Sequence, residues 1–287
     1  MPLLSVAIPT FNDYRGLSMT IQSLNMHHAD TDLEIVVFDN FGCTPSKKCC
    51  EQAGAKYVAD NKVQGSCYAK SRAIQETTGK WTLLMDSHVM VGNDGIVKLQ
   101  NHLASLPEDC HDMFHGVLLS NKGKPMATEM REEWSNNSLG KWFDRTEGGK
   151  KPLANEPVEI WGHGCALMCV RNSSWVGYHP RCIGFGGEEG AIQEQYRSRG
   201  RKVLLLPFLK WTHSFNDNTT ISHKILTEDK FRNYLLNLGG MEHSAKLWSD
   251  CILHFSNRLS METIKKVCAE CLPAGVEISN SVKVLKK

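Results

Sequence analysis

No stretch of about 18 consecutive apolar residues occurs in this chain, so the sequence predicts no membrane-spanning helix. The apolar run that begins at Leu3 is not preceded by a basic and apolar leader, and we expect neither a signal peptide nor a membrane anchor. Internal repeats and low-complexity tracts are also lacking. These absences favour a soluble, cytoplasmic, globular protein.

An excess of one charge is lacking as well. Lys and Arg number 33 and Asp and Glu 31, and the formal net charge of +2 neither supports nor excludes a polyanionic partner. The 11 cysteines include a single CxxC pair, Cys268 and Cys271, with no second pair at zinc-finger spacing. A chain of 287 residues can bury a sizeable core without disulfide bonds, so we expect reduced thiols.

What the chain does contain is an alternation of short apolar runs with helix-like segments. This alternation predicts the α/β class, with a mostly parallel sheet covered by helices on both faces. Residues 219–272 are predicted to be helices with apolar stripes. We therefore expect a sheet domain at 1–215 and a helical extension at 216–287. The predicted strands are 3–8, 33–38, 56–59, 80–85, 113–119, 162–170 and 202–206.

Residues 120–157 interrupt the alternation. They are rich in Lys, Glu, Asn and Gly, with isolated tryptophans at Trp134 and Trp142. Long surface segments in compact domains are often lids over a site, so we predict a mobile loop or lid here. Its tryptophans either pin the segment to the domain or bind substrate, and the sequence leaves both readings open.

Polar residues follow the first four predicted strands at Thr10, Asp39, Asp60 and Asp86. The carboxyl ends of parallel strands meet at one edge of a sheet, which is where ligands bind in open α/β sheets. Any one of these residues could simply form a turn, because Asp and Asn are common in turns. Four at corresponding places favour a site the size of a nucleotide.

The fourth of these strand ends carries Asp86-Ser87-His88. A carboxylate and an imidazole two residues apart at a strand end are suitable ligands for a divalent cation. Taken alone, the same residues could be a turn former and an ordinary polar side chain.

Glycines precede polar residues at two later positions. Gly162 and Gly164 flank His163 just before an apolar run, and Gly186-Gly187 precede Glu188 and Glu189 at the start of a predicted helix. Glycines allow a ligand to approach the backbone closely. Acids at a helix start are also favoured by the helix dipole alone, so a structural reading stays open for the two glutamates.

Together these motifs resemble family-2-type glycosyltransferases with the GT-A fold, a Rossmann-like sheet covered by helices, and the match in order and spacing extends over residues 1–215. The segments that carry the resemblance are Val6–Asn12, Glu34–Asn40, Gly65 with Ala69–Arg72, Gly79–Trp81 and Leu84–His88. Four further features are more similar to the polypeptide N-acetylgalactosaminyltransferases: Asp86-x-His88, Gly162–Val170, Gly186–Glu188 and Trp211-x-His213.

The resemblance implies a nucleotide-sugar donor, with a UDP-sugar the first expectation. It implies Asp86, His88 and His213 as ligands of Mn²⁺, or of Mg²⁺. A cation there suits the chemistry, because a Lewis acid neutralises the charge that develops on the departing diphosphate. Carboxylate with imidazole suits Mn²⁺ better than Mg²⁺. The donor-binding residues so implied are Pro9, Thr10, Asn12, Asp39 facing the base, Arg72 near the phosphates, Asp86, Gly162 and Gly164.

The two glutamates leave the stereochemistry open. In inverting members the second acid of a Glu-Asp pair is the general base, and this position matches Glu189. In the retaining branch with Asp-x-His the pair is Glu-Asn, so only Glu188 matches, and it serves the sugar. We predict inversion with Glu189 as the base.

The acceptor and two other functions remain open. A protein, glycan or small-molecule hydroxyl follows from the resemblance, and a hydroxylated base in DNA is the alternative acceptor. A nucleotidyltransferase would need a glycine-rich loop where the chain has Pro9 to Asn12. A catalytically silent nucleotide- or glycan-binding module is the non-enzymatic alternative. The basic clusters available to a nucleic acid are Lys47-Lys48, Lys122, Lys124, Lys150-Lys151, Arg197 to Lys202 and Lys286-Lys287.

Overall fold

The computed structural model describes residues 1–28, 31–136, 138–214 and 225–274. The strands are β1 (Leu4–Thr10), β2 (Glu34–Asp39), β3 (Lys56–Ala59), β4 (Trp81–Met85), β5 (Val89–Val91), β6 (Met113–Leu119), β7 (Pro125–Ala127), β8 (Glu129–Ser135), β9 (Ser138–Phe143), β10 (Val158–Glu159), β11 (Leu167–Arg171) and β12 (Val203–His213). The helices are α1 (Tyr14–His27), α2 (Thr44–Gln52), α3 (Ser66–Gln75), α4 (Gly95–Ser105), α5 (Ala191–Arg197), α6 (Thr227–Asn237), α7 (Ser244–Phe255) and α8 (Met261–Cys271), with a short 3₁₀ turn at Asn172–Ser174.

Among the described residues, ten strands form one sheet in the order β10-β12-β6-β11-β4-β1-β2-β3, with β5 beside β12 and β7 beside β6. The strands β4, β1, β2 and β3 are parallel to one another, and β6 is parallel to β12. Between these two groups β11 runs antiparallel to both neighbours. The predicted α/β class with a mostly parallel sheet is therefore confirmed. Thr10 and Asp39 end β1 and β2, and Asp60 and Asp86 directly follow β3 and β4, so all four lie at the same edge of the sheet.

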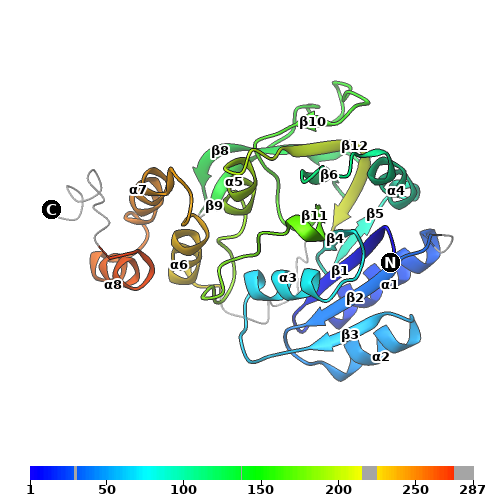
Figure 1. Cartoon of the computed structure of the whole chain (residues 1–287), viewed down its shortest axis with the longest axis horizontal. Coiled ribbons are helices and arrows are strands. Elements are labelled where there is room, and N and C mark those ends of the chain that lie inside the picture. Colours follow the sequence, from blue (N-terminus) through cyan, green and yellow to red (C-terminus); the bar gives the residue numbers. More distant parts are fainter. Residues whose placement is uncertain (29–30, 137, 215–224, 275–287) are drawn as a thin grey trace.

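The sheet has a hydrophobic core on each face because successive side chains of a strand point to opposite sides. In β1, Val6 and Ile8 pack in the core that includes α1, α2 and α4, whereas Ala7 packs in the core that includes α3 and α5. The helices thus cover both faces of the sheet (Figure 1). The helices leave uncovered the edge of the sheet at the carboxyl ends of the parallel strands, as is usual in doubly covered sheets.

The last strand is longer than the sequence predicted. The runs 202–206 and 209–213 form the single strand β12, with a shift in register between Leu206 and Lys210. Such a bulge bends a strand and re-aims its side chains. Beyond it, β12 pairs with the short strand β5, and His213 lies opposite Val89. This pairing brings the end of β12 beside His88.

The segment 120–157 contains β7, β8 and β9, and the last two form a separate two-stranded sheet. Trp134 on β8 lies 4.9 Å from the ring of Tyr234 and stacks at 5.0 Å on His254, so it pins this hairpin to α6 and α7. The side chain of Trp142 on β9 is 48% exposed. Of the two roles left open for the tryptophans, Trp134 therefore takes the structural one. Lid motion of the segment stays a prediction.

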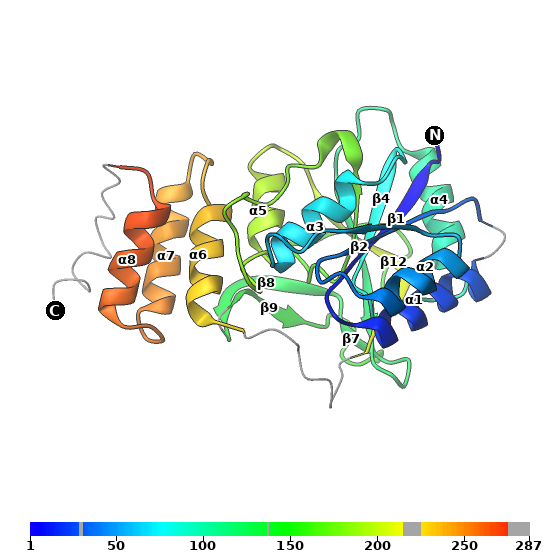
Figure 2. The same cartoon turned by 90° about the horizontal axis from the view of Figure 1, so that it is seen from below.

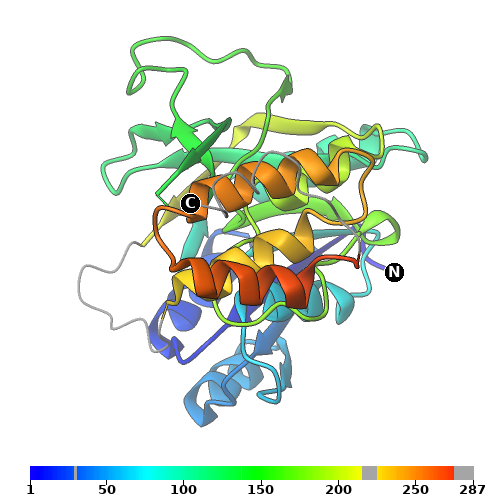
Figure 3. The ribbon, with the colours of Figure 1, turned by 90° about the vertical axis from the view of Figure 1, so that its left-hand side faces the viewer.

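The helices α6, α7 and α8 form a layer at one end of the molecule (Figures 1 and 2). Viewed from that end, the layer lies in front of the sheet (Figure 3). Phe231, Phe255 and Ile264 of this layer are fully buried in the same core as α3 and α5. The division at residues 215 and 216 lies outside the described residues and stays a prediction, as do the lysines at 286–287. Within the described ranges, no helix combines the length and the apolar character that crossing a bilayer requires.

Candidate functional site

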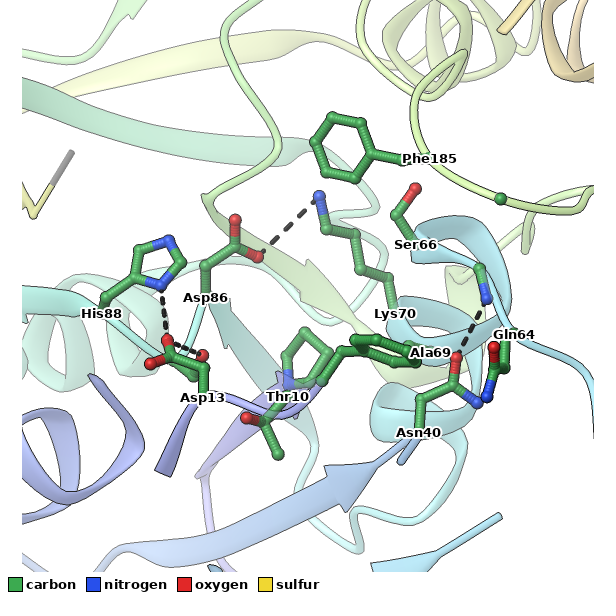
Figure 4. A pocket seen from close by; sticks show the side chains of 15 residues that line it. Thr10, Asp13, Asn40, Gln64, Ser66, Ala69, Lys70, Asp86, His88 and Phe185 are labelled. Carbon is green, nitrogen blue, oxygen red and sulfur yellow. Dashed lines mark hydrogen bonds and ion pairs between the residues drawn. The ribbon is translucent and has the colours of Figure 1, made fainter. Parts of the chain in front are cut away.

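A pocket of about 360 Å³ opens at the carboxyl edge of the parallel strands. Asp86 and His88 lie at one end of it, and Asn40 and Gln64 lie at the other (Figure 4). The volume lies within the range of small-molecule sites in proteins. The lining residues are Pro9, Thr10, Phe11, Asp13, Asn40, Gln64, Gly65, Ser66, Ala69, Lys70, Asp86, Ser87, His88, Gly184 and Phe185.

Asp86, His88 and His213 form a candidate cation-binding cluster at this pocket. One ligand atom from each lies within 4.8 Å of those of the other two. Asp86 directly follows β4, and β5 holds His88 beside the end of β12, where the two histidine Nε2 atoms are 3.1 Å apart. A carboxylate oxygen and two imidazole nitrogens are a donor set that Mn²⁺ accepts. These residues therefore fit the divalent cation that the resemblance implies.

Asp13 connects this cluster to the start of α1. Its Oδ1 accepts a hydrogen bond from the Gly16 amide at 3.0 Å, and its Oδ2 lies 2.9 Å from Ser87 Oγ and 2.8 Å from Nδ1 of His88. Burial opposes ionisation of Asp13, yet the hydrogen bonds from His88, Gly16 and Ser87 prevail and lower its pKa. Asp13 thus caps α1 and also contacts His88, 75 residues further along the chain.

The two histidines have opposite electrostatic surroundings. Burial would lower the pKa of His88, but the hydrogen bond to Asp13 and the charge of Asp86 outweigh it and raise that pKa. Burial, followed by the neighbouring His88, lowers the pKa of His213 to about 4. His213 is therefore neutral near pH 7, the form in which an imidazole binds a metal.

Lys70 on α3 is a site residue that the sequence analysis missed. Its Nζ lies 3.2 Å from Glu188 Oε1 and 3.8 Å from Asp86 Oδ1, and its side chain is 6% exposed. Burial opposes the charge, but the two carboxylates raise its pKa. A signal was present in the sequence: Lys70 lies three residues after Cys67 and three before Ala73, on the apolar face of the helix. A buried charge on such a face needs a partner.

Glu188 and Glu189 differ sharply although they are adjacent. Glu188 is fully buried and paired with Lys70. Burial and the charge of Glu188 together raise the pKa of Glu189 to about 7. Neither acid lines the pocket itself, and Lys70 is the residue that connects Glu188 to it. The pair thus supplies one ion-paired carboxylate and one acid that can exchange a proton near neutral pH.

The glycines before these acids contact α6. Gly186 and Gly187 have φ values of 90° and 85°. A Cβ on Gly187 would lie 2.5 Å from Cβ of Asn233, and one on Gly186 would lie 2.7 Å from Cε of Lys230. The sequence suggested that these glycines admit a substrate. The structure shows that they allow α6 to pack directly against the loop that carries the acids. Approach of a substrate to these glycines stays a prediction.

Two buried asparagines of α6 hold this loop. Asn233 donates to the carbonyls of Ile183 and Gly186, each at 2.8 Å, and accepts from the Ile183 amide at 3.0 Å. Asn237 donates to the carbonyl of Gly187 at 2.9 Å. Because both side chains are buried and bonded to backbone, α6 fixes the path of the chain into Glu188.

Of the predicted donor-binding residues, Pro9, Thr10 and Asp86 line the pocket. The buried hydroxyl of Thr10 has no hydrogen-bond partner among the described residues, so it can bind a ligand. Asp39 is fully buried and does not line the pocket. Its carboxylate accepts hydrogen bonds from Tyr57 Oη at 2.8 Å and from three backbone amides of the loop before α2 at 2.8–3.0 Å. These four donors occupy the acceptor positions of the carboxylate.

Four other predicted residues lie outside the lining. Asn12 has φ 50° and forms the turn into α1, a conformation that asparagine tolerates. Arg72 is paired with Glu76 at 2.8 Å. The carbonyl of Gly162 accepts from the Met130 amide at 2.7 Å, which connects it to β8. A Cβ on Gly164 would lie 2.4 Å from the ring of Trp142, so this glycine approaches an indole.

Comparison with protein families matches residues 5–167, more than half of the chain, to the model described as glycosyl transferase family 2. A search of curated proteins found no match.

Three solved structures share the fold of this chain. A structure of GalNAc-T7 with UDP, GalNAc and Mn²⁺ is 16% identical with a TM-score of 0.66, and the match covers 94% of this chain and 54% of that one. S. aureus TarS 1–349 is 13% identical with a TM-score of 0.57 over 90% and 72% of the two chains. The mannosyltransferase PcManGT from Pyrobaculum calidifontis, with GDP-Man and Mn²⁺, is 13% identical with a TM-score of 0.53 over 99% and 79%. The present chain thus spans about half the length of the first, and the predicted GT-A fold is confirmed.

Proposed function

Because this chain belongs to glycosyl transferase family 2, we propose that it transfers a sugar from a nucleotide-sugar to an acceptor hydroxyl with the help of a divalent cation. The observation that carries the proposal is the convergence of Asp86, His88 and His213 at one end of a pocket suited to a small molecule. A UDP-sugar is the preferred donor, because GalNAc-T7 was solved with UDP and TarS with UDP-GlcNAc, although PcManGT was solved with GDP-Man.

The cation would be held by Asp86, His88 and His213, and Mn²⁺ suits this donor set best. When bound, it supplies Lewis-acid neutralisation of the diphosphate leaving group. Thr10 offers its unpartnered hydroxyl to the nucleotide. Lys70 places a further positive charge between Asp86 and Glu188, where it holds both carboxylates in place.

Glu189 is the proposed general base, and inversion is the proposed outcome. The acceptor hydroxyl gives its proton to Glu189 while its oxygen bonds to the anomeric carbon, and the bond from that carbon to the diphosphate oxygen breaks on the opposite face. Two observations support this choice. Glu188 is committed to Lys70, and a base with a pKa of about 7 is matched to neutral pH.

A thermal-shift screen of nucleotide-sugars with Mn²⁺, Mg²⁺ or a chelator tests the donor and the cation together. We expect one UDP-sugar to raise the melting temperature with Mn²⁺ and the chelator to abolish the shift. The Asp86→Ala variant should lose the cation-dependent part of the rise in melting temperature. A shift from nucleotide alone that is the same in the chelator and in Asp86→Ala would favour the catalytically silent binding module.

One surface favours an anionic acceptor such as nucleic acid as the second candidate. A hollow of about 510 Å³ lies beside the bulge of β12, and Lys98, Lys151 and Lys210 are among its lining residues. Asp94 pairs with Lys98 and Glu147 pairs with Lys151, so two of the surrounding lysines are neutralised. Lys210 is three residues from His213, about 10 Å along the strand. The lysines in or beside this hollow are Lys98, Lys122, Lys124, Lys150, Lys151 and Lys210.

Binding of a DNA duplex at increasing salt decides between these acceptors. If the lysines contact phosphates, the association constant falls steeply with salt, and Lys122→Glu with Lys124→Glu weakens binding and flattens the slope. The same change at Lys47 and Lys48, on the separate helix α2, serves as the control. Salt-insensitive transfer to a small neutral acceptor, with no DNA binding, would remove the nucleic-acid candidate.

A further inference from the structure

The first turn of α1 lies against the segment that carries His88. The carboxylate of Asp13 spans the two, with Oδ1 on the Gly16 amide and Oδ2 on Ser87 Oγ and Nδ1 of His88. A dashed line in Figure 4 marks the contact between Asp13 and His88 below the imidazole, whereas Asp86 and Lys70 lie to its right. Asp13 is thus a helix cap whose second oxygen contacts a residue of the candidate cation site.

The chemistry of this contact fixes the protonation of the imidazole. An ionised carboxylate has no proton to donate, so Nδ1 of His88 carries the hydrogen of the 2.8 Å bond. In the neutral form that binds a metal, an imidazole has one N–H, so a proton on Nδ1 leaves the lone pair on Nε2. That atom lies 3.1 Å from Nε2 of His213, on the side where the ligand atoms of the cluster converge.

Gly16 provides the space for this arrangement. A Cβ at Gly16 would lie 2.3 Å from Oδ2 of Asp13 and 2.7 Å from the carbonyl oxygen of Ser87. Real Cβ atoms do not approach other atoms so closely, so alanine would force the carboxylate or the backbone at Ser87 to move. Glycine is unfavourable inside a helix because its backbone loses more freedom on folding than that of other residues. Its presence in the first turn therefore fits a need for close approach.

We propose that Asp13, seated against Gly16, is a positioning residue that fixes the tautomer and orientation of His88 for binding of the divalent cation. This inference rests on the proposed function. Partners that hold the far nitrogen of a metal-binding histidine typically change metal affinity about 10- to 100-fold when they are removed.

The competing explanation is that Asp13 only caps α1. Serine and asparagine are both strong helix caps, so Asp13→Ser and Asp13→Asn keep that role. Serine is too short to reach Nδ1 of His88. Asparagine has a single acceptor oxygen: if this oxygen caps the Gly16 amide, the amide group faces Nδ1 as a donor and moves the histidine proton to Nε2. Both variants therefore keep the helix cap and lose the contact that would position His88 for the cation.

The test is Mn²⁺ affinity, measured by electron paramagnetic resonance of free Mn²⁺ on the full chain without nucleotide. We expect the dissociation constant to rise about 10- to 100-fold in Asp13→Ser, Asp13→Asn and Gly16→Ala. Ser260→Ala removes a cap hydrogen bond from α8, far from the site, and serves as the matched control with unchanged affinity. Wild-type affinity in both Asp13 variants would overturn the proposal.

Combination of the variants tests the role of Gly16. If Gly16 acts through Asp13, adding Gly16→Ala to Asp13→Ser weakens Mn²⁺ binding no further. Full additivity would overturn the part of the proposal that concerns Gly16.

Nitrogen-15 NMR of the histidines gives a readout that does not depend on metal. We expect His88 to carry its proton on Nδ1 in the wild type and to lose that preference in Asp13→Asn. A wild-type Nε2–H tautomer would overturn the proposal. If the wild-type protein binds no cation, the proposed function is overturned. The tautomer of His88 would still show whether Asp13 holds the proton on Nδ1.

Discussion

Carboxylates of similar type have different chemistry around the pocket because their partners differ. The carboxylate of Asp39 accepts hydrogen bonds from three backbone amides and a tyrosine. Glu188 is neutralised by Lys70, and Asp13 holds His88. Asp86 lies among potential ligands, and Glu189 has a pKa of about 7. Residue type and position in the chain thus do not decide which acid binds a cation and which accepts a proton.

We expect the rate of transfer to rise with pH up to about 7 and then to level off, because Glu189 acts as a base only when ionised. The groups that set this pKa are Glu188, Lys70 and Lys230. Steady-state rates of the wild type and of Glu189→Gln across pH 5.5–8.5 test this prediction. The variant should lose about 100-fold in rate, and its rate should no longer rise with pH. Full activity in Glu189→Gln would sink the assignment.

The same pKa shift makes a prediction for stability. The folded protein keeps the Glu189 proton up to about pH 7, whereas the unfolded chain releases it near 4.5. Since the native state then holds more protons, the free energy of unfolding contributed by this group falls as pH rises between those values. The fall should be absent in Glu189→Gln, as measured by urea unfolding at each pH.

Lys70 gives a second residue-scale prediction. Lys70→Met leaves Glu188 buried without its partner, and removal of one member of a buried pair typically costs about 3–5 kcal/mol. Urea unfolding of the single variants and of Lys70→Met/Glu188→Gln forms a double-mutant cycle. The double variant should recover much of the loss. Additive losses in the cycle would show that the two side chains do not stabilise each other.

At this scale the sequence predicted the cluster and missed its supports. Asp86, His88 and His213 could be found because Asp86 and His88 closely follow a recognisable strand and His213 ends a strand-like run. Asp13 and Lys70 could not be assigned to the site, because a helix-cap motif and a lysine within a helix reveal nothing about partners distant in sequence. For Asp39, the hydrogen bonds that consume its carboxylate come from the loop geometry after β2, which no motif records.

At the scale of elements, α6 completes the loop that carries the acids. Asn233 and Asn237 bond to the backbone at 183–187, and the glycines of this loop allow the helix to approach. The sequence analysis placed α6 in an extension, because helical periodicity shows that a face is buried but does not show against what. In the structure α6 packs directly against the loop before Glu188.

Gly187→Ala tests this packing. Its φ of 85° is unfavourable for alanine, and the new Cβ would lie 2.5 Å from Cβ of Asn233. Gly177→Ala is the matched control, since its φ is 74° with nothing within 4 Å. We expect the control to lose about 1 kcal/mol of unfolding free energy. Gly187→Ala should lose more and also lower the rate of transfer. Equal losses in the two variants would contradict the packing argument.

Prediction of elements from the sequence was uneven for physical reasons. The buried parallel strands were found because they are continuous apolar runs. The hairpin of β8 and β9 was missed because its exposed strands carry charged side chains, with Glu132, Glu133 and Lys141 among them. The strands β5 and β10 are too short to give a periodic signal.

At the scale of the whole molecule, the described residues form two cores that share one sheet. The layer of α6, α7 and α8 belongs to one of these cores and joins it through Phe231 and Tyr234. The α/β class with a mostly parallel sheet could be predicted from alternation alone. The dependence of one core on the C-terminal helices could not, because the residues that pack together are far apart in the chain.

A chain that ends at residue 214 tests this dependence. It lacks α6 to α8, so apolar side chains of α3 and α5 would be exposed, and the loop before Glu188 would lose Asn233 and Asn237. We expect the truncated chain to be insoluble or unfolded, as judged by gel filtration and circular dichroism. A folded monomer with transfer activity would show that residues 1–215 are an independent domain.

Anomalous diffraction at the manganese edge, from crystals grown with Mn²⁺ and UDP, tests whether Asp86, His88 and His213 hold the cation. We expect one strong peak within ligand distance of these three residues, with the diphosphate on its open side and the uridine beside Thr10. A matching crystal of Asp86→Ala should show no peak. Nucleotide bound in this pocket with manganese absent, or bound to other residues, would contradict the account.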